Sequence, residues 1–337
     1  MNIRFATLLL MVSGILAESI AAIGQGAEPT PVRIAAGVNG HIHPAFCVTQ
    51  QGTLVVIFGQ SDFKDLRVTR STDAGKSWSE PKPFGPAVGE WLYPGSLTTL
   101  ADGRIVHLWN RWSGDGRTEP RHVVYSISKD DGVTWSEAIA MPKGTTYTRV
   151  VRHPLLELGP DAWLVSCSDA TFVFHPSTGQ AEMHNDGRTD PQGPVRPIAP
   201  IVRTPQGDWI SGYGLRSQDA GKTWSPLPTM PDLKSQGWRH DLAVLPNGWL
   251  LASEVVGPGV GGDLFRYVVS HDDGQTWKHQ VEFLKPGRPI GGRACPRALL
   301  VDPQTVGIVY YDVDAKQPGG PGVFFLRLPL AKFAPLP

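Results

Sequence analysis

The chain has 337 residues, and its 31 basic and 31 acidic side chains give it no formal net charge. This balance excludes the broad positive field by which proteins bind nucleic acids, although a local cluster of one charge is still allowed. The 38 glycines, 31 prolines and 11 tryptophans, with few helix-period segments, indicate a turn-rich all-β fold.

The first 27 residues have the pattern of a secretory signal segment. Arg4 precedes an apolar run over residues 5–17, and small residues that suit cleavage lie between Ala17 and Ala27. The run is shorter than the roughly 20 apolar residues of a membrane-spanning helix, and no later stretch reaches that length. We therefore expect a signal peptide at 1–27 and one secreted or periplasmic domain at 28–337, without a membrane span.

A short apolar strand, a turn with glycine or proline and a second strand recur six times after this segment. The units divide the remaining chain into blocks of about 50 residues, the size of a four-stranded propeller blade. The last unit is short of one strand, while Val32 to Ala36 precedes the first unit without a partner. We expect this segment to close the ring as the outer strand of the last blade. The six units begin at His43, Tyr93, Arg152, Arg196, Arg239 and Cys295.

Four copies of the signature SxDxGx[ST]W mark the turn between the third and fourth strands of units one, two, four and five. In such a hairpin the aspartate accepts backbone N–H groups, the glycine supplies a positive φ and the tryptophan packs on its neighbours. A segment of unit three, from Phe174 to Gly179, resembles a decayed copy of this signature. We expect a structural role for the signature aspartates, which are Asp73, Asp130, Asp219 and Asp272.

These signatures resemble the Asp boxes, or BNR repeats, of the sialidase (neuraminidase) superfamily. The segment from His43 to Trp78 is also similar to the family's stretch from its RIPAL motif through its first box. The resemblance implies an all-β, six-bladed β-propeller. It further implies an exo-glycosidase that cleaves terminal sialic acid with three arginines on the sugar carboxylate, a tyrosine nucleophile activated by glutamate, and an aspartate acid/base.

The catalytic pattern of the family is matched only in part. Ile42 stands where the family has its first arginine, Glu254 falls where a later arginine is expected, and no tyrosine opens the last inner strand. Asp62, on the loop after the second strand of blade one, matches the acid/base aspartate. Because function belongs to sites rather than folds, the activity has to be argued from the residues at the site.

In a propeller of this kind the box turns lie on one face, and the starts of inner strands and ends of second strands lie on the other. A site is therefore expected at the second face, where Asp62, Glu254 and Tyr311 are the catalytic candidates. Arginine offers two-point hydrogen bonding to a carboxylate or sulfate, so these residues predict an anionic glycan as ligand. The candidates for substrate binding are His43, Tyr93, Arg152, Arg196, Arg239, His240 and Arg297.

Two structural alternatives stay open for these side chains. The arginines can form salt bridges with Asp241, Glu254 or Asp312 instead of binding a ligand. The tryptophans that could stack on sugar rings can equally pack between blades. These tryptophans are Trp91, Trp109, Trp112 and Trp238.

The leading functional prediction is a hydrolase of the sialidase-like superfamily that acts on a terminal acidic sugar. Arg196, Arg239 and Arg297 would hold the anion, Asp62 would protonate the leaving oxygen, and a tyrosine or Glu254 would stabilise the developing positive charge. The alternatives are a polysaccharide lyase, with a histidine and tyrosine pair that removes a proton beside a uronate, and a non-catalytic glycan-binding or protein-binding propeller.

No cofactor or metal is expected. The three cysteines, Cys47, Cys167 and Cys295, match no zinc or redox spacing, and at least one should be a small buried apolar residue. The chain contains no EF-hand loop, phosphate-binding glycine motif or HExxH pair.

Overall fold

The computed structural model describes residues 29–40, 42–61, 64–85, 90–112, 122–142, 150–167, 170–186, 200–227, 229–230, 241–256, 264–284, 295–312 and 319–335. The chain divides into two compact units, Met1–Thr30 and Pro31–Pro337. The predicted signal segment at 1–27 lies outside the described residues. Over the described ranges, no helix is both long and apolar enough to cross a membrane.

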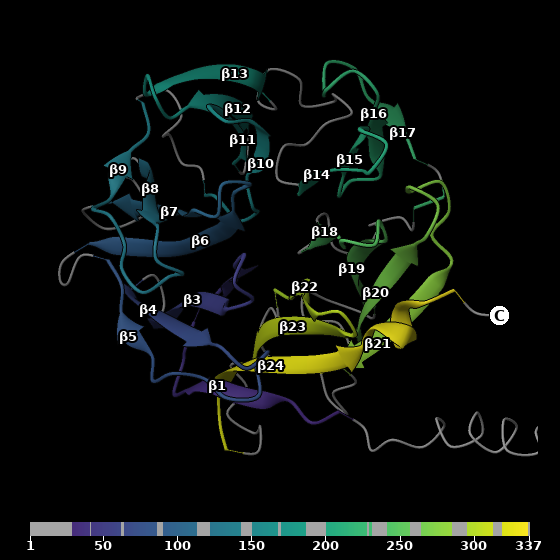
Figure 1. Ribbon diagram of the computed structural model, residues 1–337. Coiled ribbons are helices and arrows are strands. Elements are labelled where there is room, and N and C mark those ends of the chain that lie inside the picture. Colours follow the sequence, from purple (N-terminus) through teal and green to yellow (C-terminus); the bar gives the residue numbers. More distant parts are fainter. Residues whose placement is uncertain are drawn as a thin grey trace, which may run out of the picture. The chain divides into compact units, whose positions relative to one another are not determined.

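The described part of Pro31–Pro337 forms six four-stranded antiparallel sheets arranged as a ring of blades (Figure 1). Blade 1 contains β2 (Ala45–Val48), β3 (Leu54–Ser61), β4 (Lys64–Ser71) and β5 (Lys82–Pro83). Blade 2 contains β6 (Trp91–Thr99), β7 (Ile105–Trp112), β8 (His122–Ser128) and β9 (Ile139–Ala140). Blade 3 contains β10 (Leu156–Gly159), β11 (Ala162–Ser166), β12 (Ala170–His175) and β13 (Gln180–Asp186).

The second half of the ring has the same strand order. Blade 4 contains β14 (Ile201–Arg203), β15 (Trp209–Ser211), β16 (Leu215–Ser217) and β17 (Ser225–Pro226). Blade 5 contains β18 (Leu242–Val244), β19 (Leu250–Val256), β20 (Leu264–Ser270) and β21 (His279–Leu284). Blade 6 contains β22 (Arg297–Asp302), β23 (Thr305–Asp312), β24 (Gly322–Pro329) and β1 (Val32–Ala36), and a 3-10 helix, η1 (Leu330–Phe333), follows β24. The predicted all-β six-bladed propeller is confirmed.

Blade 6 is closed by the N-terminal strand, as the sequence predicts. Strand β1 pairs antiparallel with β24, with Val32 opposite Phe325 and Ala36 opposite Gly322 (Figure 1). The pairing covers an edge of β24 that would otherwise expose unpaired N–H and C=O groups. It also ties the two ends of the domain together.

Each box is a compact hydrogen-bonded turn. In the first box the backbone N–H and hydroxyl of Ser77 donate to the carboxylate of Asp73, at 2.9 and 2.6 Å, and Gly75 N–H donates to Ser71 Oγ at 2.8 Å. The same contacts recur around Asp130, Asp219 and Asp272. In the third box the hydroxyl of Thr223 is the main cause that lowers the pKa of Asp219 to about 2. The carboxylates of the boxes are therefore occupied by their own turns.

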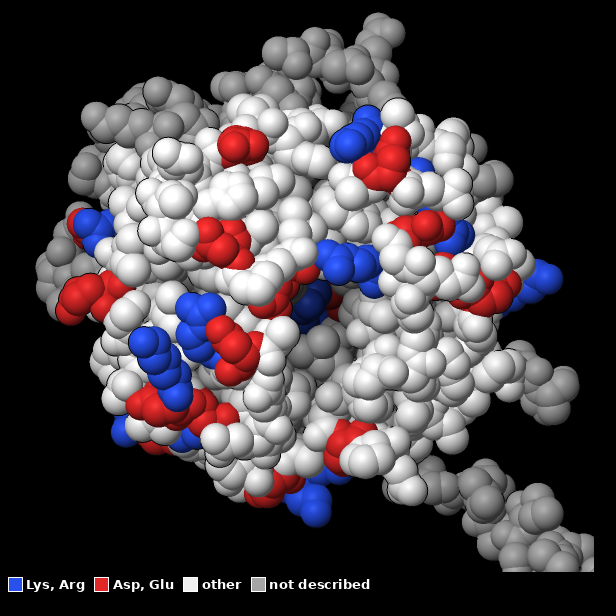
Figure 2. Space-filling model, turned by 45° about the horizontal axis from the view of Figure 1, so that its top comes forward, with Lys and Arg blue, Asp and Glu red and all other residues white. Residues whose placement is uncertain are grey.

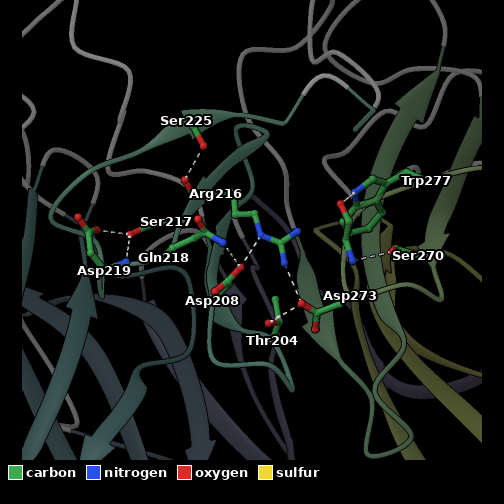
Figure 3. A network of polar contacts seen from close by, with 11 residues as sticks. Thr204, Asp208, Arg216, Ser217, Gln218, Asp219, Ser225, Ser270, Asp273 and Trp277 are labelled. Carbon is green, nitrogen blue, oxygen red and sulfur yellow. Dashed lines mark hydrogen bonds and ion pairs between the residues drawn. The ribbon is translucent and has the colours of Figure 1, made fainter.

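Two of the boxes also join neighbouring blades through a half-buried ion pair. Arg216, which precedes the box of blade 4, donates through Nη2 to Asp273 in the box of blade 5 at 2.8 Å, and Thr204 Oγ1 donates to the same oxygen (Figure 3). Arg70 of blade 1 makes the corresponding contact with Asp131 of blade 2 at 3.1 Å. The same type of arginine–aspartate contact therefore connects blade 1 to blade 2 and blade 4 to blade 5.

Blade 3 replaces the box with a different pair of residues. The predicted decayed copy forms the β12–β13 turn, where the N–H of Ser177 donates to Asp161 at 2.7 Å and its hydroxyl donates to the other carboxylate oxygen at 2.5 Å. Asp161 lies in the β10–β11 turn, so the carboxylate comes from the neighbouring hairpin and not from the signature position.

Candidate functional site

The candidate site lies at the end of the propeller where the inner strands begin, opposite the boxes. The inner strands are β2, β6, β10, β14, β18 and β22, and the chain leaves each one toward the box face. Figure 2 shows one face of the propeller without marking the candidate residues, and on that face basic and acidic side chains stand beside a hollow near the middle. The charges are interspersed, as expected for a chain without net charge.

Four of the predicted site residues, from four different blades, come together at this end. The ring of His43 lies near those of both Tyr93 and Tyr311, with centroid distances of 5.0 and 5.9 Å. The guanidinium carbon of Arg152 lies 5.8 Å from the centroid of the Tyr93 ring. His43 and both tyrosines are buried, and Arg152 is half-buried. A base, two phenols and a cation therefore share one small region.

Cys295 is a fifth member of this group, and the sequence analysis did not assign it to the site. Its Sγ lies 3.1 Å from Nδ1 of His43. His43 and Cys295 each stand two residues before an inner strand, and both have left-handed backbone, with φ of 40° and 38°. Such values are uncommon outside glycine and mark a position that the surrounding structure enforces. We call His43, Tyr93, Arg152, Cys295 and Tyr311 the mouth cluster.

A β-bulge in the inner strand of blade 2 positions Tyr93. The register of β6 against β7 shifts between Tyr93 and Ser96, and Gly95 has a φ of 69° there. The buried ring of His107 contacts the carbonyl of Pro94 through Nε2. Burial lowers the pKa of His107 to about 3, so this ring is neutral and donates its N–H. The bulge re-aims the start of the strand, as bulges beside functional sites commonly do.

Arg297, a predicted substrate-binding residue, is paired with Asp241. The carboxylate of Asp241 is fully buried and accepts hydrogen bonds from Arg297 Nη1, from Tyr267 Oη at 2.9 Å and from the N–H of Ala298 at 2.8 Å. Burial raises the pKa of Tyr267, which therefore donates as a neutral phenol. Arg297 therefore follows the alternative that the sequence left open, in which an arginine forms a salt bridge instead of binding a ligand. Its ion pair with Asp241 joins blade 5 to blade 6.

Glu254, a predicted catalytic residue, is engaged by the neighbouring strands of its own blade. Arg266 Nε of β20 lies 2.6 Å from Glu254 Oε2, and Arg266 Nη1 donates to Gln280 of β21 at 2.8 Å. The pair follows from the strand register, in which Glu254 is directly opposite Arg266. The carboxylate of Glu254 is therefore held by Arg266 of β20, on the outer side of its own strand in blade 5.

The remaining candidates divide into two groups. Asp62, Arg196, Arg239, His240 and Trp238 lie outside the described residues. Trp109 and Trp112 are buried, and Trp112 stacks on Trp91 at a centroid distance of 6.2 Å. The ammonium of Lys64, from blade 1, lies 5.0 Å from the centre of the Trp91 ring. Within the described ranges, no three His, Cys, Asp or Glu side chains are placed to hold a metal ion.

Comparison with known proteins finds BNR-repeat and sialidase sequences as distant relatives and sialidase-like propellers as structures of the same fold. The family described as "BNR repeat-like domain" matches residues 25–154. A protein named "Sialidase" from Bacteroides fragilis is 25% identical over 335 residues, which cover 79% of this chain and 59% of the relative. The chain thus spans less than two thirds of the length of that relative.

Solved structures share the fold at low identity. The NanB sialidase from Streptococcus pneumoniae is 10% identical with a TM-score of 0.61, covering 94% of this chain and 73% of its own. The intramolecular trans-sialidase from Ruminococcus gnavus, in complex with oseltamivir carboxylate, is 12% identical with a TM-score of 0.62, covering 93% and 100%. A protein of unknown function from Dyadobacter fermentans is 17% identical with a TM-score of 0.56, covering 90% and 99%.

Proposed function

We propose, from the premise that this chain is a six-bladed BNR-repeat propeller and a distant relative of sialidases, that it is a secreted enzyme acting on a terminal acidic sugar of a glycan. The observation that carries the proposal is the mouth cluster. Its histidine, tyrosines and arginine are the group types that glycosidic bond cleavage beside a carboxylate requires. The secreted location rests on residues 1–27 and stays a prediction.

The anionic group of the sugar is assigned to Arg152. Its guanidinium is half-buried beside the Tyr93 ring, where a charge-assisted hydrogen bond to a carboxylate is stronger than at an exposed site. Arg196 and Arg239, which precede β14 and β18 in the sequence and lie outside the described residues, would add further cations in this proposal. Arg297 contributes less in this proposal, because Asp241 already neutralises it.

Hydrolysis would proceed through Tyr311 and Asp62. The phenol oxygen of Tyr311 attacks the anomeric carbon while the bond to the leaving oxygen breaks, and His43 accepts the phenol proton. Asp62 gives a proton to the leaving oxygen. A water molecule then attacks the anomeric carbon and gives a proton to Asp62, while the bond to Tyr311 breaks and the phenol recovers its proton from His43. A neutral phenol suits this role because it avoids repulsion with the carboxylate of the substrate.

A lyase is the second candidate, and the proximity of His43 to two tyrosines favours it. In that reaction His43 or a tyrosinate removes the proton on the carbon next to the carboxylate, whose charge Arg152 neutralises. The freed electron pair forms a carbon–carbon double bond as the bond to the leaving oxygen breaks. The phenol of a tyrosine protonates that oxygen.

The products distinguish these reactions. We expect the purified protein to release reducing sugar from a panel of sialosides, sulfated glycans and uronate polymers, without new ultraviolet absorbance. An unsaturated, ultraviolet-absorbing product would overturn hydrolysis in favour of the lyase. Ligand-induced thermal stabilisation without any product would show a binding module, because a ligand that binds only the folded state raises its stability.

The variant Tyr311→Phe tests the assigned nucleophile in the same assay. It keeps the buried ring but removes the attacking oxygen, so we expect kcat to fall by at least about a hundredfold with little change in stability. Tyr125→Phe, at a tyrosine that packs between Trp163 and Phe174 of blade 3, is the matched control and should keep the wild-type rate. A Tyr311→Phe variant that retains wild-type kcat would remove Tyr311 from the reaction.

A further inference from the structure

We propose that Cys295 is a reactive thiol, activated by His43, and that its covalent modification closes the mouth. The pair has the arrangement of a nucleophile and its base, with Sγ and Nδ1 3.1 Å apart. The pair lies just before β2 of blade 1 and β22 of blade 6. The reactivity of the thiol is independent of the proposed function, whereas the closure of the mouth rests on it.

The contact is built by the fold and not by sequence proximity. His43 and Cys295 are separated by 252 positions, and the ring closure brings the starts of β2 and β22 together. Both residues adopt left-handed backbone two residues before their strands. Two equivalent strained positions in adjacent blades thus turn their side chains toward one another.

The groups around the pair can stabilise its charged form. When no substrate engages His43, proton transfer from the thiol to Nδ1 gives a thiolate beside an imidazolium, and the thiolate is the nucleophilic form of cysteine. The rings of Tyr93 and Tyr311 flank His43, and Arg152 adds a positive charge beyond Tyr93. Arg297, two residues after Cys295, has its charge balanced by Asp241.

The protein contains its own reference thiols. None of the three cysteines forms a disulfide, and Cys47 and Cys167 are buried whereas Cys295 is half-buried. Burial is the main cause that raises the pKa of Cys47 to about 12. Cys47 should accordingly be inert in the folded protein, because it is almost never a thiolate at neutral pH.

The covalent step with iodoacetamide defines the chemistry. The sulfur of Cys295 forms a bond to the methylene carbon of the reagent as iodide leaves, and the thiol proton passes to His43 and then to water. The carbamidomethyl group would occupy space beside His43, Tyr93 and Tyr311. Binding of a sugar at the mouth should be lost for steric reasons.

The test is the rate of iodoacetamide labelling of each cysteine in the folded full-length protein, measured by mass spectrometry from pH 5 to 9. We expect Cys295 to react at least about a hundredfold faster than Cys47 at pH 7. Its rate should have a midpoint below the value of about 8.5 that is typical of an unperturbed thiol. Labelling of Cys295 no faster than that of Cys47, or a midpoint at or above about 8.5, would overturn the proposal.

The variant His43→Asn tests the activating role. Asparagine tolerates left-handed backbone, so the main loss is the imidazole. We expect labelling of Cys295 to slow at least tenfold at pH 7, whereas Tyr125→Phe, at a tyrosine that packs on Trp163 and Phe174 outside the mouth cluster, should label within twofold of wild type. An unchanged rate in a folded His43→Asn variant contradicts activation by His43. If that variant does not fold, the pH profile of the wild type decides.

Closure of the mouth has a separate readout. Wild-type protein labelled at Cys295 should lose at least tenfold in affinity for the acidic glycan that it binds, and Cys295→Ser protein treated in the same way should lose none. Rapid labelling with unchanged affinity would reject closure alone. Failure of the proposed function would instead appear as absence of glycan binding in the unlabelled protein.

Discussion

Replacing Gly95 by alanine is expected to lower the free energy of unfolding by about 3–5 kcal/mol. Gly95 has a φ of 69°, and a Cβ at this position would lie 1.8 Å from the carbonyl oxygen of Leu108 and 2.7 Å from its carbonyl carbon. The clash is with the backbone of β7, so no flexible side chain can move away to relieve it. Either the bulge or the pairing of β6 with β7 must give way, and Tyr93 moves with them.

The matched control is Gly52→Ala. Gly52 has a φ of 81°, but a Cβ added there has no heavy atom within 4 Å. Gly52→Ala should therefore lower the free energy of unfolding only by the cost of placing alanine in left-handed backbone, about 1–2 kcal/mol. Urea unfolding followed by tryptophan fluorescence measures both variants. Equal losses for Gly95→Ala and Gly52→Ala would contradict the close approach of β6 to β7 at the bulge.

Asp241→Asn is expected to cost about 3–5 kcal/mol of unfolding free energy. The substitution keeps the shape of the side chain but removes the charge that balances Arg297. The amide has one oxygen acceptor, so either Arg297 or the donors Tyr267 and Ala298 N–H face an N–H₂ group in a fully buried position. A buried charge without its partner is one of the most destabilising single changes in a protein.

The half-buried pair of Arg327 and Asp302, which is more exposed than the Asp241 carboxylate, supplies the comparison. These side chains are 3.2 Å apart, and their exposed fractions are 28% and 30%. Asp302→Asn should cost less than about 1 kcal/mol, since solvent screens such pairs. Both variants are measured by denaturant unfolding at the same pH. A loss for Asp241→Asn as small as that for Asp302→Asn would show that Arg297 does not depend on Asp241.

The architecture of the propeller could be predicted from sequence because it is periodic. Each blade buries the same alternation of strand and turn, and each box fixes one turn by contacts within eight residues. The sequence also predicted that Val32 to Ala36 closes the ring, because this strand had no partner and the last blade lacked one strand. These features depend on local patterns or on simple counting of strands.

The site depends on contacts that no local pattern encodes. Strand order places His43, Tyr93, Arg152 and Tyr311 at one end of the ring, and the structure brings these four together. The left-handed backbone that turns Cys295 toward His43 has no signal in the apolar periodicity. Pairings such as Glu254 with Arg266 depend on strand register, which a single sequence specifies only weakly.

The most direct test of the account is calorimetric titration of the acidic glycan bound by the wild type into Arg152→Ala. We expect the affinity to fall at least tenfold, because a hydrogen bond to a charged group contributes about 1.5–3 kcal/mol. Arg104→Ala, at the opposite end of β6 from Tyr93 and paired with Asp102, should bind as the wild type does. Wild-type affinity in Arg152→Ala, or an equal loss in Arg104→Ala, would contradict an anion site at the mouth cluster.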